Sequence, residues 1–160
     1  MTAMKALTVC QPYAELIARG LKPIENRTWP TAYRGPIAIH AGKSREWMDP
    51  EDLEAYPAMA FGAVVAVARV VACLKYDDVA PWPNRWRHLR QHEHAGGPWC
   101  WVLEDVRRLP VPLPCRGAQG LWELPEAVDA VARSDGDGQS GPRAPESDVL
   151  PASPVRESRG

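Results

Sequence analysis

Apolar side chains recur at helical spacing early in the chain. Tyr13, Leu16 and Ile17 lie three and four residues apart, Pro12 suits a first helical turn and Gly20 suits a left-handed exit residue. Residues 12–19 are therefore predicted to form a short helix. The segment before this helix, 5–9, is a short β-prone run. After the helix, Pro23 keeps Lys22 out of the helical region, and residues 24–29 are expected to be extended.

Longer β-prone segments follow. After turn chemistry at 34–36, residues 37–41 alternate in the period-2 pattern of a strand, and the valine-rich segment 61–75 is mostly apolar on both faces, as in a central barrel strand. Further strands are predicted at 99–106 and 116–124, spaced by prolines 110, 112 and 114. Helices are predicted at 50–56, capped by Asp49, and from 125 to about 132.

This order of elements predicts an α+β fold, a small mixed β-barrel with short peripheral helices. We expect one domain over residues 1–133, followed by a disordered tail at 134–160, where Ser, Asp, Gly and Pro show no periodicity. The longest apolar segment, 61–74, is too short for a membrane span and carries Arg69. The first residues lack the apolar core of a secretory signal, so we expect a cytoplasmic protein without a membrane partner.

Composition narrows the chemistry. The net charge of -1 argues against broad electrostatic binding of nucleic acid, although residues 1–45 hold a surplus of Lys and Arg that could form one local basic face. The four cysteines are widely spaced, which favours free thiols over a zinc ribbon or a disulfide framework. His88, His92 and His94 lack accompanying ligands and are interpreted as solvated, so no metal and no cofactor are expected.

The stretch 20–27 carries the strongest functional signal. Lys22, Glu25 and Arg27 place two bases and one acid where the first helix is predicted to give way to a strand, and alternation puts Glu25, Arg27 and Trp29 on one strand face. A charge cluster alone is equally consistent with a solvated strand face. The nearby aromatic residues and His40 favour the lining of a small polar pocket.

These residues also carry a resemblance to a known family. The pattern G-x-K-x-x-E-x-R after a helix opened by Gln-Pro resembles the signature of the ASCH domain family, a branch of the PUA-like barrels, in its bacterial and phage members. Segments 5–14, 33–43, 101–106 and 116–122 resemble the family as well, so the likeness covers about residues 4–127. The resemblance implies a PUA-like barrel with a ligand pocket formed by Gln11, Lys22, Glu25, Arg27, Trp29, Tyr33, His40 and Lys43.

Two main functions follow from this resemblance. In a module that binds RNA or a nucleotide, as proposed for the family, Arg27 and Lys22 would hold a phosphate or a base edge, Glu25 would accept from an exocyclic amine, and Trp29 or Tyr33 would stack. The family also includes a single-strand ribonuclease and an amidohydrolase of N-acetylated cytidine. The threonine nucleophile of the amidohydrolase is replaced here by Glu25, which leaves Lys22 and Glu25 as possible catalytic acid–base residues.

Two further alternatives stay open. A non-catalytic regulatory module, acting in transcription or translation, is expected if side chains of the protein itself fill the pocket. In the irregular segment 77–98, Trp82 is interpreted as an anchor for the loop, whereas Trp86, among Arg85, Arg87 and Arg90, is equally suited to anchoring and to stacking on bases.

Overall fold

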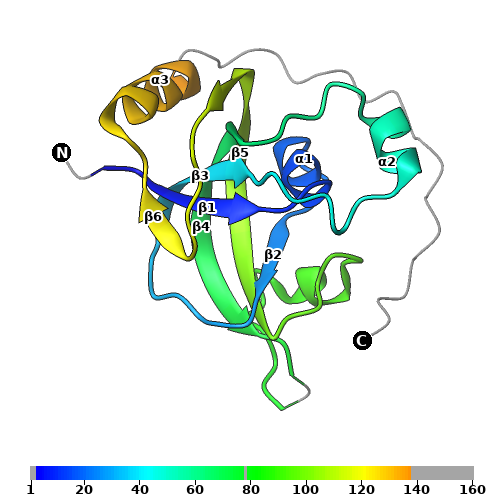
Figure 1. Cartoon of the computed structure of the whole chain (residues 1–160). Coiled ribbons are helices and arrows are strands. Elements are labelled where there is room, and N and C mark those ends of the chain that lie inside the picture. The colour runs from blue at the N-terminus through cyan, green and yellow to red at the C-terminus, as the bar shows by residue number, and fades with distance from the viewer. Residues whose placement is uncertain (1–2, 78, 138–160) are drawn as a thin grey trace.

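Six strands form one strongly curled sheet in the computed structural model, which describes residues 3–77 and 79–137 (Figure 1). The strand order is β2-β5-β4-β3-β1-β6, with β1 parallel to β3 and the other neighbours antiparallel. This half-barrel confirms the predicted α+β class. The strands are β1 (Lys5–Val9), β2 (Ile24–Arg27), β3 (Gly35–Ala41), β4 (Ala63–Lys75), β5 (Trp99–Pro114) and β6 (Leu121–Glu123).

Short helices lie around the sheet, as predicted (Figure 1). They are α1 (Tyr13–Ala18), α2 (Pro50–Ala55), the 3-10 helix η1 (Arg87–Gln91) and α3 (Glu126–Asp137). The left-handed exit after α1 is confirmed, because Gly20 has a φ of 74°. Helix α3 continues to Asp137, past the expected helix end near Ala132, so residues 134–137 of the expected tail are helical. The expected disorder of 138–160 lies outside the described residues.

Strand β5 is longer than predicted, because the prolines expected to separate two strands lie inside it. Among the described residues, strand β2 pairs only with residues 99–102 of β5, so beyond Val102 one edge of β5 has no strand partner there. The Cys115 N–H donates to the Gly62 carbonyl of the β4 side, at 3.1 Å. Since successive N–H groups point to opposite edges, the ring nitrogen of Pro114 faces the unpaired edge, where no sheet hydrogen bond is lost.

The core lies on both faces of the central strand β4, as its two apolar faces predict. One cluster fills the concave side beneath α1 and includes Leu7, Ile17, Ile39 and Trp101. A second cluster, with Met4, Leu109, Leu124 and Ala132, packs α3 against the opposite face. No helix among the described residues is long and apolar enough to cross a membrane.

Helix α3 is held to the start of β1 by one buried hydrogen bond, in which the Met4 N–H donates to Asp129 at 2.9 Å. We expect Asp129→Ala to lower the free energy of unfolding by about 1–3 kcal/mol, because the buried N–H loses its acceptor. Chemical denaturation measures the change. Glu126→Ala, at an exposed acid of the same helix, is the control, and equal effects of both variants would contradict the assigned contact.

Candidate functional site

The turn from α1 into β2 buries the charged residues singled out in the sequence. Leu21 and Lys22 donate their N–H groups to the Leu16 carbonyl, and the Pro23 carbonyl accepts from Leu103 of β5. These bonds fix the chain on both sides of Lys22. The Lys22 and Glu25 side chains consequently point inward, with only 3% and 7% of each residue exposed.

Glu25 lies between the cations Lys22 and Arg27. Its Oε1 is 3.5 Å from Lys22 Nζ and accepts the Asn26 N–H at 3.0 Å, and its Oε2 is 3.5 Å from an Nη of Arg27. The Lys22 ammonium also donates to the Ile24 carbonyl. Burial lowers the pKa of Lys22, and the Glu25 carboxylate offsets part of this shift. Among the described residues, Glu25 Oε2 and Arg27 Nε are buried without a hydrogen-bond partner.

Arg27 connects two strands that are not neighbours in the sheet. Strand β2 is at one end of the strand order, and β1 is separated from it by three strands. The curl of the sheet nevertheless brings them together, so that an Nη of Arg27 donates to the Thr8 carbonyl of β1 at 2.7 Å. This hydrogen bond spans the open side of the half-barrel. About a quarter of the Arg27 side chain, 23%, is exposed there.

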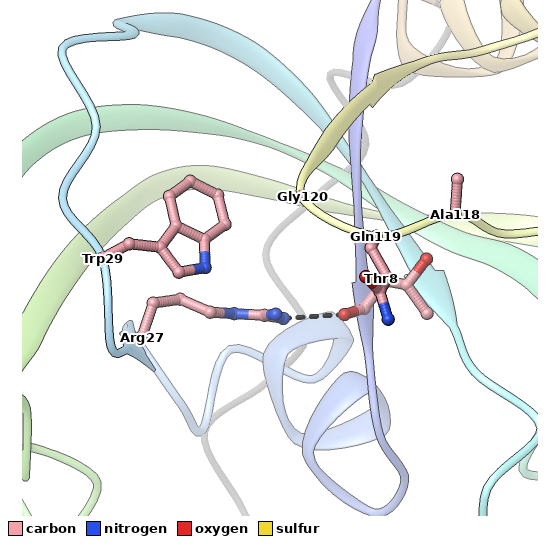
Figure 2. A pocket seen from close by; sticks show the side chains of 6 residues that line it. All are labelled: Thr8, Arg27, Trp29, Ala118, Gln119 and Gly120. Carbon is pink, nitrogen blue, oxygen red and sulfur yellow. Dashed lines mark hydrogen bonds between the residues drawn. The ribbon is translucent and has the colours of Figure 1, made fainter.

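An open cleft of about 410 Å³ lies at this crossing and is called the first cleft. Arg27 and Trp29 form one side, and Thr8 forms the other together with the loop before β6 (Figure 2). The Trp29 ring is half-buried and packs edge-on against Trp101, with 4.8 Å between ring centroids. The complete lining is Thr8, Arg27, Trp29, Ala118, Gln119 and Gly120.

A larger cleft of about 730 Å³, the second cleft, adjoins the first. Its floor includes His40, whose Nδ1 is 3.2 Å from the Thr8 hydroxyl and whose Nε2 is 2.7 Å from the Cys115 carbonyl. Because the Thr8 hydroxyl accepts from Trp122 Nε1 at 3.2 Å, its own proton is available for Nδ1, and Nε2–H donates to the carbonyl. Burial lowers the pKa of His40 and so favours the neutral ring. The hydrogen bond to the Cys115 carbonyl raises the pKa and offsets part of this shift.

The eight residues expected to line one pocket are divided among several places. Arg27 and Trp29 line the first cleft, and His40 and Lys43 line the second. Lys22 and Glu25 converge with Arg27 but line neither cleft.

The remaining two expected residues, Gln11 and Tyr33, make structural hydrogen bonds away from both clefts. The fully buried Gln11 side chain donates to the Ala60 carbonyl at 2.7 Å and accepts the Glu15 N–H at 2.9 Å. The Tyr33 hydroxyl donates to the Pro36 carbonyl. Within 3–77 and 79–137 no cluster of three potential metal ligands occurs.

Thr8, Arg116 and Gln119 line the clefts but were not predicted from the sequence. Segment 116–124 was expected to be a strand throughout, whereas β6 begins only at Leu121 and the preceding residues form the shared wall of both clefts. A polar segment with Gly117 and Gly120 was the available signal for a loop.

The tryptophans of segment 77–98 make structural contacts. Trp82 is buried and its Nε1 donates to the Lys75 carbonyl at 2.9 Å, which confirms its anchoring role. Trp86 Nε1 donates to Glu104 at 3.2 Å, and the Arg85 guanidinium lies 5.3 Å from the Trp86 ring. Neither tryptophan lines the first or the second cleft.

The curled six-stranded sheet with short peripheral helices is a PUA-like fold. The family model of the ASCH domain matches residues 7–112, and the chain belongs to this family. It is similar to activating signal cointegrator 1 of Homo sapiens, 23% identical, and of Mus musculus, 22% identical, in alignments of 143 positions that cover 79% of this chain. The chain spans only 23% of the length of these relatives.

A solved structure agrees on the fold. ASCH from Zymomonas mobilis aligns with a TM-score of 0.51 over 82% of this chain and 94% of that chain, at 16% identity. At this identity, the likeness concerns the fold alone.

The contact between Gly117 and the His40–Thr8 pair can be tested by one methyl group. A Cβ at residue 117 would stand 2.6 Å from His40 Cε1 and 2.8 Å from the Thr8 hydroxyl. We expect Gly117→Ala to lower the free energy of unfolding by about 1–3 kcal/mol, because the imidazole must shift from its hydrogen bonds. Thermal unfolding measures the change. In the control Gly96→Ala the nearest atom is 4.0 Å away, and a comparable loss there would contradict this account.

Proposed function

We propose that this protein binds RNA or a nucleotide and that one base occupies the first cleft. The observation that carries the proposal is the placement of the Arg27 guanidinium and the Trp29 indole together at an open cleft of about 410 Å³. This volume lies in the range of small-ligand sites. A cation with directional donors beside an aromatic ring suits a planar, hydrogen-bonding ligand such as a nucleobase.

The donors of Arg27 are oriented before any ligand arrives. The Thr8 carbonyl accepts from one Nη, which leaves further guanidinium N–H groups for the carbonyl and ring-nitrogen acceptors of a base or for a phosphate. Gln119, across the cleft, offers an amide with both donor and acceptor character. Trp29 supplies ring surface for stacking, and its packing on Trp101 restricts the indole.

Lys22 and Glu25 have a positioning role in this proposal. Their side chains lie behind Arg27 and outside both clefts, so direct contacts with a base are assigned to Arg27, Gln119 and Trp29. The Glu25 carboxylate, 3.5 Å from Arg27, favours the extended guanidinium position. Membership of the ASCH family, which is associated with RNA binding, supports the same class of ligand.

The proposal predicts that Arg27→Ala weakens binding of nucleoside 5′-monophosphates and short single-stranded RNA by about 10- to 100-fold, because charged hydrogen bonds contribute about 1.5–3 kcal/mol. Calorimetric titration measures the affinity. Arg34→Ala, which removes an exposed arginine outside both clefts, is the charge-matched control and should bind as the wild type.

A second variant separates binding from folding. Arg27→Ala removes one of the two cations beside the buried Glu25 carboxylate and could therefore lower stability as well as affinity. The unfolding transition of this variant is therefore compared with that of the wild type. Gln119 is exposed, and we expect Gln119→Ala to leave stability unchanged and to weaken binding by several-fold. Unchanged affinity in both variants would overturn the proposal.

The hydrolase alternative has one specific observation in its favour. Burial lowers the pKa of Lys22, which raises the fraction of neutral amine, and a carboxylate lies 3.5 Å away. Such a pair can transfer protons. Because neither residue lines a cleft, binding without turnover is the function we prefer. The non-catalytic regulatory module is the third candidate, and the similarity to activating signal cointegrator 1 is its support.

We therefore expect no cleavage of short single-stranded RNA and no deacetylation of N4-acetylcytidine by the wild type, measured by chromatography of the products. Cleavage or deacetylation that falls by about 10²–10⁴-fold in both Lys22→Ala and Glu25→Gln would establish the hydrolase instead. That activity should rise with pH through a value below the ordinary pKa of lysine, because the neutral amine is the base.

A further inference from the structure

The two clefts share part of their walls. Thr8, Ala118 and Gln119 line both, so the first cleft passes directly into the second along the loop before β6. Thr8 is fixed at this junction, because its carbonyl accepts from Arg27 and its hydroxyl contacts His40 and Trp122. The junction is therefore a rigid floor between two adjoining open spaces.

Two cations stand at the second cleft. Lys43 and Arg116 are exposed and line it, and neither has an acidic side chain within ion-pair distance among the residues that the structure describes. A Cβ at Gly62 would stand 2.9 Å from Lys43 Cε, so the lysine stem lies against the backbone at this edge of the cleft. Two unneutralised cations at an open cleft suit a phosphate group.

We infer that the two clefts form one groove for single-stranded RNA, in which a base lies at Arg27 and Trp29 and the backbone phosphate of the neighbouring nucleotide lies between Lys43 and Arg116. This inference rests on the proposed function, since it extends the same site by one nucleotide. It also narrows the ligand class from nucleotides in general to single-stranded RNA. A lone nucleotide would occupy the first cleft and leave the second cleft empty, whereas a strand would fill both.

Base-paired RNA does not meet these requirements. Its bases are stacked and paired inside the helix, whereas the first cleft requires one base to be turned out toward Arg27 and Trp29. His40 adds no charge to the second cleft, because both of its ring nitrogens are hydrogen-bonded and burial lowers its pKa. Attraction for the backbone phosphate is therefore assigned to Lys43 and Arg116 alone.

The experiment compares the affinity of one ligand series for three proteins. The ligands are a nucleoside 5′-monophosphate, the corresponding dinucleotide and a single-stranded hexanucleotide, with a hexanucleotide duplex as a further probe. The proteins are the wild type, the double variant Lys43→Ala/Arg116→Ala, and the control Arg34→Ala/Arg107→Ala, which removes two exposed cations outside both clefts. Titrations at several salt concentrations give the number of phosphate contacts.

We expect the wild type and the control to bind the dinucleotide and the single-stranded hexanucleotide at least about 10-fold more tightly than the monophosphate. The double variant should lose this gain and keep the affinity for the monophosphate. The slope of log affinity against log salt for the hexanucleotide should fall by about 0.7–1.4, the change for one or two phosphate contacts on a single strand.

Other outcomes assign the failure to a particular step. Equal affinity for monophosphate and hexanucleotide, or a gain that persists in the double variant, would overturn the extended groove and leave the base site intact. Preference for the duplex would overturn it as well. Failure of the wild type to bind the monophosphate, together with oligonucleotide binding that Arg27→Ala does not weaken, would overturn the proposed function and with it this inference.

Discussion

The hydrogen bond from Arg27 to the Thr8 carbonyl is the contact on which the site depends. Within the part of the chain that the structure describes, backbone pairing joins β2 only to β5 and joins β1 only to β3 and β6, so the curled sheet does not close between β2 and β1. A side chain crosses this gap where a closed barrel would have a ladder of backbone bonds. The space left beside the guanidinium is the first cleft, and the strand edges that frame it hold Arg27 and Thr8 in place.

The charges behind Arg27 explain how an arginine keeps this extended position. Burying Lys22 and Glu25 costs desolvation free energy, which their mutual attraction offsets only in part, so the pair is a weak source of stability. Its effect is directional, because the carboxylate lies 3.5 Å from each cation and favours one placement of the guanidinium. On the other side, the chain of hydrogen bonds from Trp122 through Thr8 to His40 fixes the acceptor strand. Both partners of the crossing hydrogen bond are thereby preorganised.

Local signals predicted most elements and the convergence of the three charges, because the helix exit at Gly20, the turn at Pro23 and the alternation after it act within a few residues. The length of β5 was missed, since the tolerance of Pro114 depends on an unpaired sheet edge that the sequence alone does not reveal. The walls of the clefts were missed for a similar reason. Thr8 and Gln119 are separated by 111 positions in the sequence. They line the same cleft only because the sheet curls. No local sequence signal shows whether the Lys22 side chain lines an open pocket or forms a buried ion pair with Glu25.

The most direct measurement follows the side-chain N–H resonances of the wild type by nuclear magnetic resonance during titration with a nucleoside 5′-monophosphate. We expect Arg27 Nε–H, Trp29 Nε1–H and the Gln119 amide to shift with one common dissociation constant, since these groups surround or adjoin the same cleft. Trp82 Nε1–H and Trp86 Nε1–H, which donate to Lys75 and Glu104 away from it, should stay unchanged. Shifts confined to Trp86, or no shifts at saturating nucleotide, would show that the nucleotide does not occupy the first cleft.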